Sequence, residues 1–419
     1  MKHRLKGLLA LVLSLVMVFA LATNAWAAVR IGGQDISENT YWTYSDNAWS
    51  VGNDQSYNVH LSNNTLTLNE FVYNGNSNIY SDGNLTLNLI GNNAVTYGES
   101  GAAAVHVTGN LTIKGDNGSS LTVSGTYSIT DGIHADNVTI ESGTVTATGG
   151  EAGISANNNV VITGGTVTAT GDEAGIHSDK TITITGGTVT ATGDEGRGIY
   201  TKEGNVTISG GTVKATGKTH GIFAYNDGHS GGMKVAISGG SVEAYATNDT
   251  GSIGIYAPGY DGEIAISGDN TQVTVGCATG LKASTVNILE NSTVNITTNA
   301  TTFTDGKTID CTNLYFDADT SKLGTWYQWS ENGGSVNISS NTNQLTVDEA
   351  KGVQTLTIGK ISTGGPGNTN PYPPIIYNPT PTPEPEVTAP NTFDGGIASA
   401  VVVTILSATG GAWLAKKKD

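Results

Sequence analysis

Aromatic rings and imidazoles recur at one position of a short repeated segment. The residue that directly follows the repeated apolar residue is, along the chain, Tyr80, His106, His134, Ser155, His177, Tyr200, Phe223, Tyr256 and Lys282. If the apolar residue faces inward, these side chains face solvent. Aromatic faces pack on the C–H faces of pyranose rings, so the rings predict a track for an extended polysaccharide. The alternative is that they only stabilise a sheet by packing on one another.

Polar side chains recur two residues beyond the rings, where they would fix sugar hydroxyl groups. This second position reads Asp82, Thr108, Asp136, Asn157, Asp179, Lys202 and Tyr225. Carboxylates and amides are therefore expected beside the rings. The ligand-binding residues predicted from both positions are Tyr80, His106, His134, His177, Tyr200, Phe223, Tyr256, Asp136, Asn157 and Asp179.

Acidic residues gather in the turns that precede the ring positions. The turns "GGEAG", "GDEAG" and "GDEGRG" supply Glu151, Asp172, Glu173, Asp194 and Glu195. Like charges one strand apart repel, so these side chains either extend into water or share a cation. Calcium, with its flexible oxygen coordination, is the candidate metal for Asp172, Glu173, Asp194 and Glu195. No other cofactor is required.

The repeat that positions these side chains has a period in the twenties. The heptapeptide "GTVTATG" begins at Gly143, Gly165, Gly187 and Gly211, in steps of 22, 22 and 24 residues. Such a period with strand-like alternation is typical of a solenoid, and the leucine and asparagine pattern of leucine-rich repeats is absent. The sequence therefore predicts stacked coils.

Each unit contains three short strand-like runs separated by Gly, Asn or Asp, so three sheets are expected. Because side chains alternate across a strand, the apolar members must face one interior. The second run would stack Val138/Ile140, Val160/Ile162, Ile182/Ile184, Val206/Ile208, Val235/Ile237 and Ile264/Ile266, and the third Val145/Ala147, Val167/Ala169, Val189/Ala191 and Val213/Ala215. We predict an all-β, right-handed parallel β-helix with about 22 residues per turn, handed as parallel crossovers nearly always are.

Both ends of the sequence predict export and attachment. "MKHRLKGLLALVLSLVMVFALATNAWA" combines a basic start, an apolar run and a small-x-small ending, which is typical of a signal peptide cleaved after Ala27. The Pro-rich stretch 361–394 predicts an unfolded stalk, because proline supplies no amide donor. The uncharged segment 395–415 is long enough to cross a bilayer, and three lysines follow it.

The predicted order is a signal peptide (1–27), an N-terminal cap (28–59), the β-helix (60–300), irregular C-terminal turns and a cap (301–360), the stalk (361–394), a transmembrane or sorting segment (395–415) and a basic cytoplasmic tail (416–419). The last three parts resemble a Gram-positive cell-wall sorting signal, in which "APNTFD" keeps Pro390 and Thr392 of the usual motif. Phe393 replaces the glycine and Ala389 the leucine, so a plain membrane anchor is the alternative to sortase cleavage near Thr392. The expected location is the extracellular surface of a Gram-positive-type bacterium.

Composition argues against two function classes. With 36 acidic and 19 basic residues, the chain lacks the basic footprint that nucleic acid requires. Cys277 and Cys311 are the only cysteines, which leaves no ligand set for zinc or redox chemistry. They either form one disulfide or remain two buried free thiols. The chain is expected to be a monomer.

Recurrent units of the form "DGI-x-A-x-x-VTI-x-x-GTVTATG", such as residues 131–149, resemble those of a group of bacterial surface proteins, mostly clostridial. That group carries a right-handed parallel β-helix carbohydrate-binding domain akin to the pectate lyase fold, and the resemblance covers roughly residues 60–300. It implies binding of plant cell-wall polysaccharide, pectic or cellulosic, with calcium in some members. Such units specify the fold well and the ligand poorly, because one scaffold hosts unrelated activities.

Two other functions stay open. An adhesin would use the same rod to hold a host glycan or a host protein. A polysaccharide lyase or hydrolase would need a cationic base or paired carboxylates, and Arg197 and Lys202 near Asp194 and Asp179 are the combination to test. No pectate lyase or polygalacturonase signature surrounds them, so a non-catalytic binding protein is favoured.

Overall fold

The computed structural model of the protein describes residues 27–101, 103–226, 231–248, 251–289, 292–299, 307–316, 328–331, 334–337 and 353–359. The chain divides into two compact units, Met1–Ile375 and Ile376–Asp419, and every described residue belongs to the first. The described residues form strands and turns, and they include no helix long and apolar enough to cross a membrane. The predicted stalk, membrane segment and basic tail lie outside the described residues, as does the signal peptide up to residue 26.

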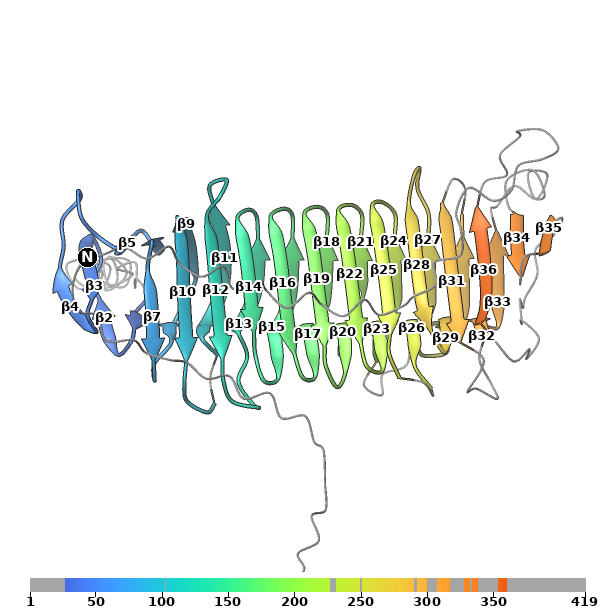
Figure 1. Ribbon diagram of the computed structural model, residues 1–419, viewed down its shortest axis with the longest axis horizontal. Coiled ribbons are helices and arrows are strands. Elements are labelled where there is room, and N and C mark those ends of the chain that lie inside the picture. The colour runs from blue at the N-terminus through green and yellow to red at the C-terminus, as the bar shows by residue number, and fades with distance from the viewer. Residues whose placement is uncertain are drawn as a thin grey trace, which may run out of the picture. The chain divides into compact units, whose positions relative to one another are not determined.

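The alternation of apolar and polar residues produces short strands that stack coil upon coil (Figure 1). Each coil contributes three runs, and each run pairs in parallel with the equivalent runs of the coils before and after it. The described strands form a parallel β-solenoid of about ten coils, which confirms the predicted all-β solenoid. The right-handed winding of the solenoid and its likeness to the pectate lyase fold stay predictions.

Three ladders of strands result. The first ladder carries the ring positions and contains β8 (Ile79–Ser81), β11 (Val105–Gly115), β13 (Ile133–Ile140), β15 (Ala152–Ile162), β17 (Ala174–Ser178), β20 (Arg197–Thr201), β23 (His220–Ala224), β26 (Ile253–Ala257), β29 (Thr279–Ala283) and β32 (Lys307–Asp310). The second contains β6 (Thr65–Asn69), β9 (Leu85–Ile90), the second halves of β11, β13 and β15, β18 (Thr181–Ile184), β21 (Val206–Ile208), β24 (Lys234–Ile237), β27 (Glu263–Ile266), β30 (Thr285–Ile288) and β33 (Asn313–Phe316). The third contains β7 (Val72–Gly75), β10 (Asn92–Tyr97), β12 (Ser120–Gly125), β14 (Thr144–Thr148), β16 (Thr166–Gly171), β19 (Thr188–Gly193), β22 (Thr212–Gly217), β25 (Ser241–Ala246), β28 (Gln272–Cys277) and β31 (Thr293–Asn299).

These ladders form two hydrogen-bonded sheets rather than the three expected from the sequence. β11, β13 and β15 continue around the corner between the first two ladders without a break, so both ladders belong to one sheet of 23 strands. The third ladder belongs to a second sheet of 13 strands. Parallel pairing continues through β32 and β33, which lie beyond residue 300, where the sequence pattern has become faint.

The interior of the coils is one continuous apolar core. Ile162, Ile184 and Ile208 are register partners on successive coils and are fully buried. Val167 and Val189 stack in the same way in the third ladder. All of the interior pairs predicted from the sequence are buried, as expected. Each buried valine or isoleucine contributes about 1.5–3 kcal/mol relative to an exposed position, and only neighbouring coils provide that burial.

Two features fix the corners of each coil. Between the first and second ladders, the side-chain amide of Asn137 donates to Asn110 at 2.7 Å, and that of Asn159 donates to Asn137 at 2.8 Å. Between the third and first ladders, the backbones approach so closely that only glycine fits. A Cβ on Gly175 would lie 2.3 Å from the backbone nitrogen of Thr192.

Antiparallel strands end the stack on both sides. At the N-terminal side, antiparallel pairing joins β1 (Val29–Ile31) to β2 (Gln34–Ile36), β3 (Thr40–Ser45) to β4 (Ala48–Val51) and to β5 (Val59–Ser62), and β5 to β6. Trp42 and Trp49 pack there against the core, beside Phe71. At the other side, β31 pairs with β36 (Val353–Gly359), which pairs with β34 (Gln328–Glu331), which pairs with β35 (Gly334–Asn337). Such pairing interrupts the parallel edges that would otherwise recruit further strands.

Candidate functional site

The predicted ring positions lie in one straight file on the outer face of the first ladder. This ring file consists of register partners on successive strands, namely Tyr80, His106, His134, Ser155, His177, Tyr200, Phe223, Tyr256 and Lys282. Each residue follows a buried apolar residue, such as Ile176 or Ile199, so alternation turns it outward. The predicted alignment is confirmed, whereas the role of the file in binding stays a prediction.

The rings in the middle of the file are closed to solvent. Tyr200 is only 8% exposed and Phe223 only 6%. Tyr200 lies between His177 and Phe223, with ring centroids 5.1 and 5.6 Å away and interplanar angles of 13° and 21°. A strand spacing of about 4.8 Å thus brings successive rings face to face, and only their edges reach the surface. The expectation that Tyr200 and Phe223 face open solvent is therefore wrong.

Phe223 is the centre of an aromatic cluster outside the coil. Its ring stacks on those of His220 and Tyr256, at centroid distances of 4.4 and 5.1 Å and interplanar angles of 9° and 1°. The guanidinium carbon of Arg197 lies 4.5 Å from the Tyr200 ring centroid and 5.6 Å from that of Phe223. These contacts desolvate the rings and add cation–π attraction, so this part of the file stabilises the sheet.

His220 makes the aromatic cluster sensitive to acid. Burial, with contributions from Arg197 and Lys282, lowers the pKa of His220 to about 4. The folded chain therefore favours the neutral imidazole, whereas the unfolded chain takes up the proton near pH 6.5. We expect the free energy of unfolding to decrease as the pH falls from about 6.5 toward 4, and to decrease less in His220→Gln. Urea unfolding at about pH 7 and pH 5 measures this, and an equal decrease in both proteins would contradict it.

The first three rings of the file pack less tightly. Tyr80, His106 and His134 meet edge to face, with centroid separations of 5.6 and 5.5 Å, and all three are half-buried. His134 Nδ1 lies 3.0 Å from Asp131 Oδ2, and this hydrogen bond raises the pKa of His134, while burial lowers the pKa of His106. The backbone N–H of Ala152 donates to the other oxygen of Asp131 at 3.0 Å. Because edge-to-face contact covers less ring surface than stacking, part of these rings stays open to a ligand.

The polar positions beside the file contact one another and the rings. The side-chain amide of Asn157 donates to Asp136 Oδ1 at 2.9 Å, and this pair is exposed. Asp179 Oδ1 lies 3.5 Å from His177 Nε2. That nitrogen is buried without a hydrogen bond in the described part of the chain, and burial lowers the pKa of His177. Asp136, Asn157 and Asp179 are groups to which sugar hydroxyls can bond.

The acidic turns do not gather into a metal site. Glu173 Oε1 accepts a hydrogen bond from Arg197 Nη1 at 2.9 Å, and Glu195 pairs with Lys218. Over the described ranges, no group of three or more His, Cys, Asp or Glu side chains is placed to hold a metal ion. The turns instead border a cleft of about 360 Å³ lined by Asp172, Glu173, Glu195, Gly196, Arg197 and Thr219. Calcium binding by Asp172, Glu173, Asp194 and Glu195 stays an untested prediction.

Arg197 is held as a paired cation. One guanidinium nitrogen bonds Glu173, the guanidinium plane covers Tyr200, and Nε is buried without a hydrogen bond among the described residues. These contacts hold the guanidinium against Glu173 and Tyr200 rather than toward an open ligand position. The contacts therefore give no support to Arg197 as the base of a lyase.

Cys277 and Cys311 are both buried free thiols. The register pairs Lys282 with Asp310, which places Cys311 at the level of Ala283 rather than beside Cys277. Burial raises the pKa of both thiols, that of Cys311 to about 11. The structure thus corresponds to the free-thiol alternative and contains no disulfide between these two residues.

His220 belongs to the site but was not predicted from the sequence, and Arg197 was considered there only as a base for a lyase, not as a cover for the rings. They are register partners two residues before the repeated isoleucine, a position that holds Ala152 and Ala174 in the preceding coils. The replacement of alanine by a large side chain at this repeated position was the sequence signal that could have identified both residues. A groove formed by β27, β30 and β33 was also missed, because the steps on either side of the β27–β30 pair depart from the 22-residue period, with 29 residues from Lys234 to Glu263 and 28 from Thr285 to Asn313.

Residues 72–250 match a family model described as "Carbohydrate-binding domain-containing protein". No curated protein and no solved structure matches the chain. The matched range contains the ring file from Tyr80 to Phe223, together with the acidic turns. The match supports carbohydrate binding, and suggests a non-catalytic role, for this part of the chain.

Proposed function

We propose that this chain is a non-catalytic protein that holds an extended polysaccharide along the ring file. The observation that carries the proposal is the match of residues 72–250 to a carbohydrate-binding family model. Within that range, the ring file interrupts an outer surface that elsewhere consists largely of repeated threonines. Rings beside hydrogen-bonding groups are the side-chain combination that sugar binding needs.

The polymer would lie along the file, crossing successive strands. Register positions are about 4.8 Å apart, which is close to the length of one sugar unit in an extended chain, so contacts can recur coil after coil. Tyr80, His106 and His134 supply open ring surface at one end of the file. Asp136 and Asn157 supply hydrogen bonds beside it, and the stacked rings in the middle keep the face flat.

A plant cell-wall chain, pectic or cellulosic, is the ligand class that we favour, and an extracellular protein attached through residues 395–415 is its proposed setting. The likeness to clostridial surface proteins and the pattern of the two chain ends support these points. An adhesin that binds a host glycan or protein is the alternative. A lyase on the same scaffold is the second alternative.

Replacing Asp136 and Asn157 together with alanine is expected to weaken polysaccharide retention about tenfold, because two exposed hydrogen-bonding groups are lost from the track. The measurement is affinity electrophoresis of the full chain through gels that contain pectate, hydroxyethyl cellulose, xylan or mucin, with and without a chelator. Because the pair is exposed, the free energy of unfolding should change by about 0.5 kcal/mol or less.

Thr122→Ala is the matched control, since Thr122 is an exposed residue on the outer face of the third ladder. Its retention should equal that of the unmodified chain. If the Asp136 and Asn157 double variant were retained as strongly as the unmodified chain, the ring file would not be the binding surface. Retention by mucin alone would favour the adhesin, release of unsaturated sugars would identify a lyase, and loss of retention with chelator would indicate calcium.

A further inference from the structure

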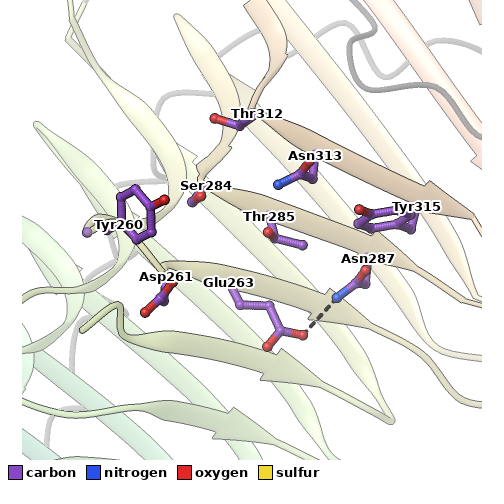
Figure 2. Close-up of a pocket in the computed structure, with 10 residues that line it drawn as sticks. Tyr260, Asp261, Glu263, Ser284, Thr285, Asn287, Thr312, Asn313 and Tyr315 are labelled. Carbon is purple, nitrogen blue, oxygen red and sulfur yellow. Dashed lines mark hydrogen bonds between the residues drawn. The ribbon is translucent and has the colours of Figure 1, made fainter.

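A second surface site lies on the second ladder, outside residues 72–250. It is a groove of about 680 Å³, within the range of small-molecule sites, and its floor is formed by β27, β30 and β33 (Figure 2). The ring file belongs to the first ladder, so the groove occupies another face of the coils.

The floor of the groove presents hydrogen-bonding side chains from three adjacent strands. Glu263, Thr285 and Asn313 are register partners, and all three alternate with buried apolar residues. Asn287 and Tyr315 pair two residues further along the same strands. The groove therefore offers a carboxylate, a hydroxyl and two amides across a flat surface about two strand spacings wide, or roughly 9.6 Å.

Glu263 is oriented before any ligand arrives. Lys234 Nζ lies 3.1 Å from its Oε1, and the side-chain amide of Asn287 donates to the same oxygen at 2.8 Å. These contacts leave Oε2 as an acceptor. Within the described part of the chain, the side chains of Thr285 and Asn313 have no hydrogen-bond partner, so they are available to a ligand.

Two tyrosines stand at opposite ends of this row of polar side chains (Figure 2). Tyr260 is 91% exposed and Tyr315 is 41% exposed. Neither ring packs against another ring among the described residues, in contrast to the stacked rings of the ring file. No described ring covers their faces, so each tyrosine can offer a face to the C–H face of a sugar.

The turn that carries Tyr260 is held in place. The N–H of Gly262 donates to the carbonyl of Gly259 at 3.1 Å, and Gly259 has φ of +108°, a conformation that favours glycine. The turn also packs on the neighbouring coil, where a Cβ on Gly232 would lie 1.8 Å from the backbone nitrogen of Gly262. The backbone thus holds Tyr260 outward beside the groove.

We propose that this groove is a second carbohydrate site and that it takes a neutral oligosaccharide. Pyranose faces pack on Tyr260 and Tyr315, and sugar hydroxyls bond the polar floor between them. Asp261 and Glu263 line the groove, and none of its described lining residues is a lysine or arginine. Lys234 offsets the charge of Glu263, so Asp261 is the carboxylate that disfavours a uronate chain. The inference shares only its ligand class with the proposed function, because the two sites have no residue in common.

The test is calorimetric titration of the full chain with cellohexaose, xylohexaose, mannohexaose and hexagalacturonate. We expect at least one neutral hexasaccharide to bind, and the Tyr260→Ala/Tyr315→Ala double variant to bind it about tenfold more weakly. Tyr127→Ala is the matched control, because Tyr127 is 49% exposed in a turn far along the chain from the groove. This control should bind within about twofold of the unmodified chain.

Unchanged binding by the Tyr260→Ala/Tyr315→Ala variant would overturn the second site. If the Asp136→Ala/Asn157→Ala variant then lost binding, the ring file would remain the carbohydrate surface. Binding of hexagalacturonate alone would overturn the neutral ligand class. If none of the four sugars bound and no gel retained the chain, the second site and the proposed function would both fall. Because Tyr260 is almost fully exposed, Tyr260→Ala alone serves as the variant that preserves the fold if the double variant unfolds.

Discussion

Replacing Phe223 with alanine is expected to lower the free energy of unfolding by about 3 kcal/mol, although Phe223 lies outside the solenoid core. The ring is 6% exposed and stacks on His220, Tyr256 and Tyr200, so its removal leaves a cavity among aromatic neighbours. Large-to-small replacements of a buried phenylalanine cost about 3–5 kcal/mol. The lower end of that range applies here, because an outer face can collapse more readily than the interior.

Urea unfolding measures the effect, and the same protein is tested for polysaccharide retention under conditions in which it stays folded. Phe223→Leu is the matched variant, since it keeps most of the apolar volume and should cost about 1.5 kcal/mol or less. Retention by folded Phe223→Ala should equal that of the unmodified chain, because the face of the ring is already covered. A variant with unchanged stability and lost retention would instead make Phe223 a ligand contact.

The alternation of Val, Ile and Thr was enough to predict the interior of the coils. Ile184 and Val189 face inward because the period of a strand is two and because only one face can be buried against neighbouring coils. The same reasoning predicted that His177, Tyr200 and Phe223 align, since equivalent positions of a repeat share a register. The fold class and the alignment of the ring file were therefore predictable from the local sequence pattern alone.

The exposure of the rings was not predictable from that pattern. Strand spacing allows His177, Tyr200 and Phe223 to stack face to face, and Arg197 and His220 then cover these rings from a neighbouring position of the same strands. The groove beside Tyr260 could not be predicted from the repeat either. Its turn belongs to a coil in which Val242 and Val273, which are register partners, are 31 residues apart, so the turn lies in an insertion that the 22-residue repeat does not describe.

The stacked isoleucines are the second place where a large effect is expected. Ile184 is fully buried between Ile162 and Ile208, its register partners on the adjacent coils. Replacing Ile184 with alanine removes three carbon atoms from this stack of isoleucines. Neighbouring coils cannot fill the resulting cavity without shifting their backbones. Such replacements cost about 2–5 kcal/mol, and a value of about 3 kcal/mol is expected here.

Thr183→Ala is the matched control for Ile184→Ala, because Thr183 is the preceding residue of the same strand, β18, and faces outward. Its replacement should change the free energy of unfolding by about 0.5 kcal/mol or less. Because each coil contacts only its neighbours, Ile184→Ala should also raise hydrogen exchange most in β18 and its partners β15 and β21. Equal destabilisation by the two substitutions would contradict an inward file of isoleucines, and with it the outward direction of the rings that share the same alternation.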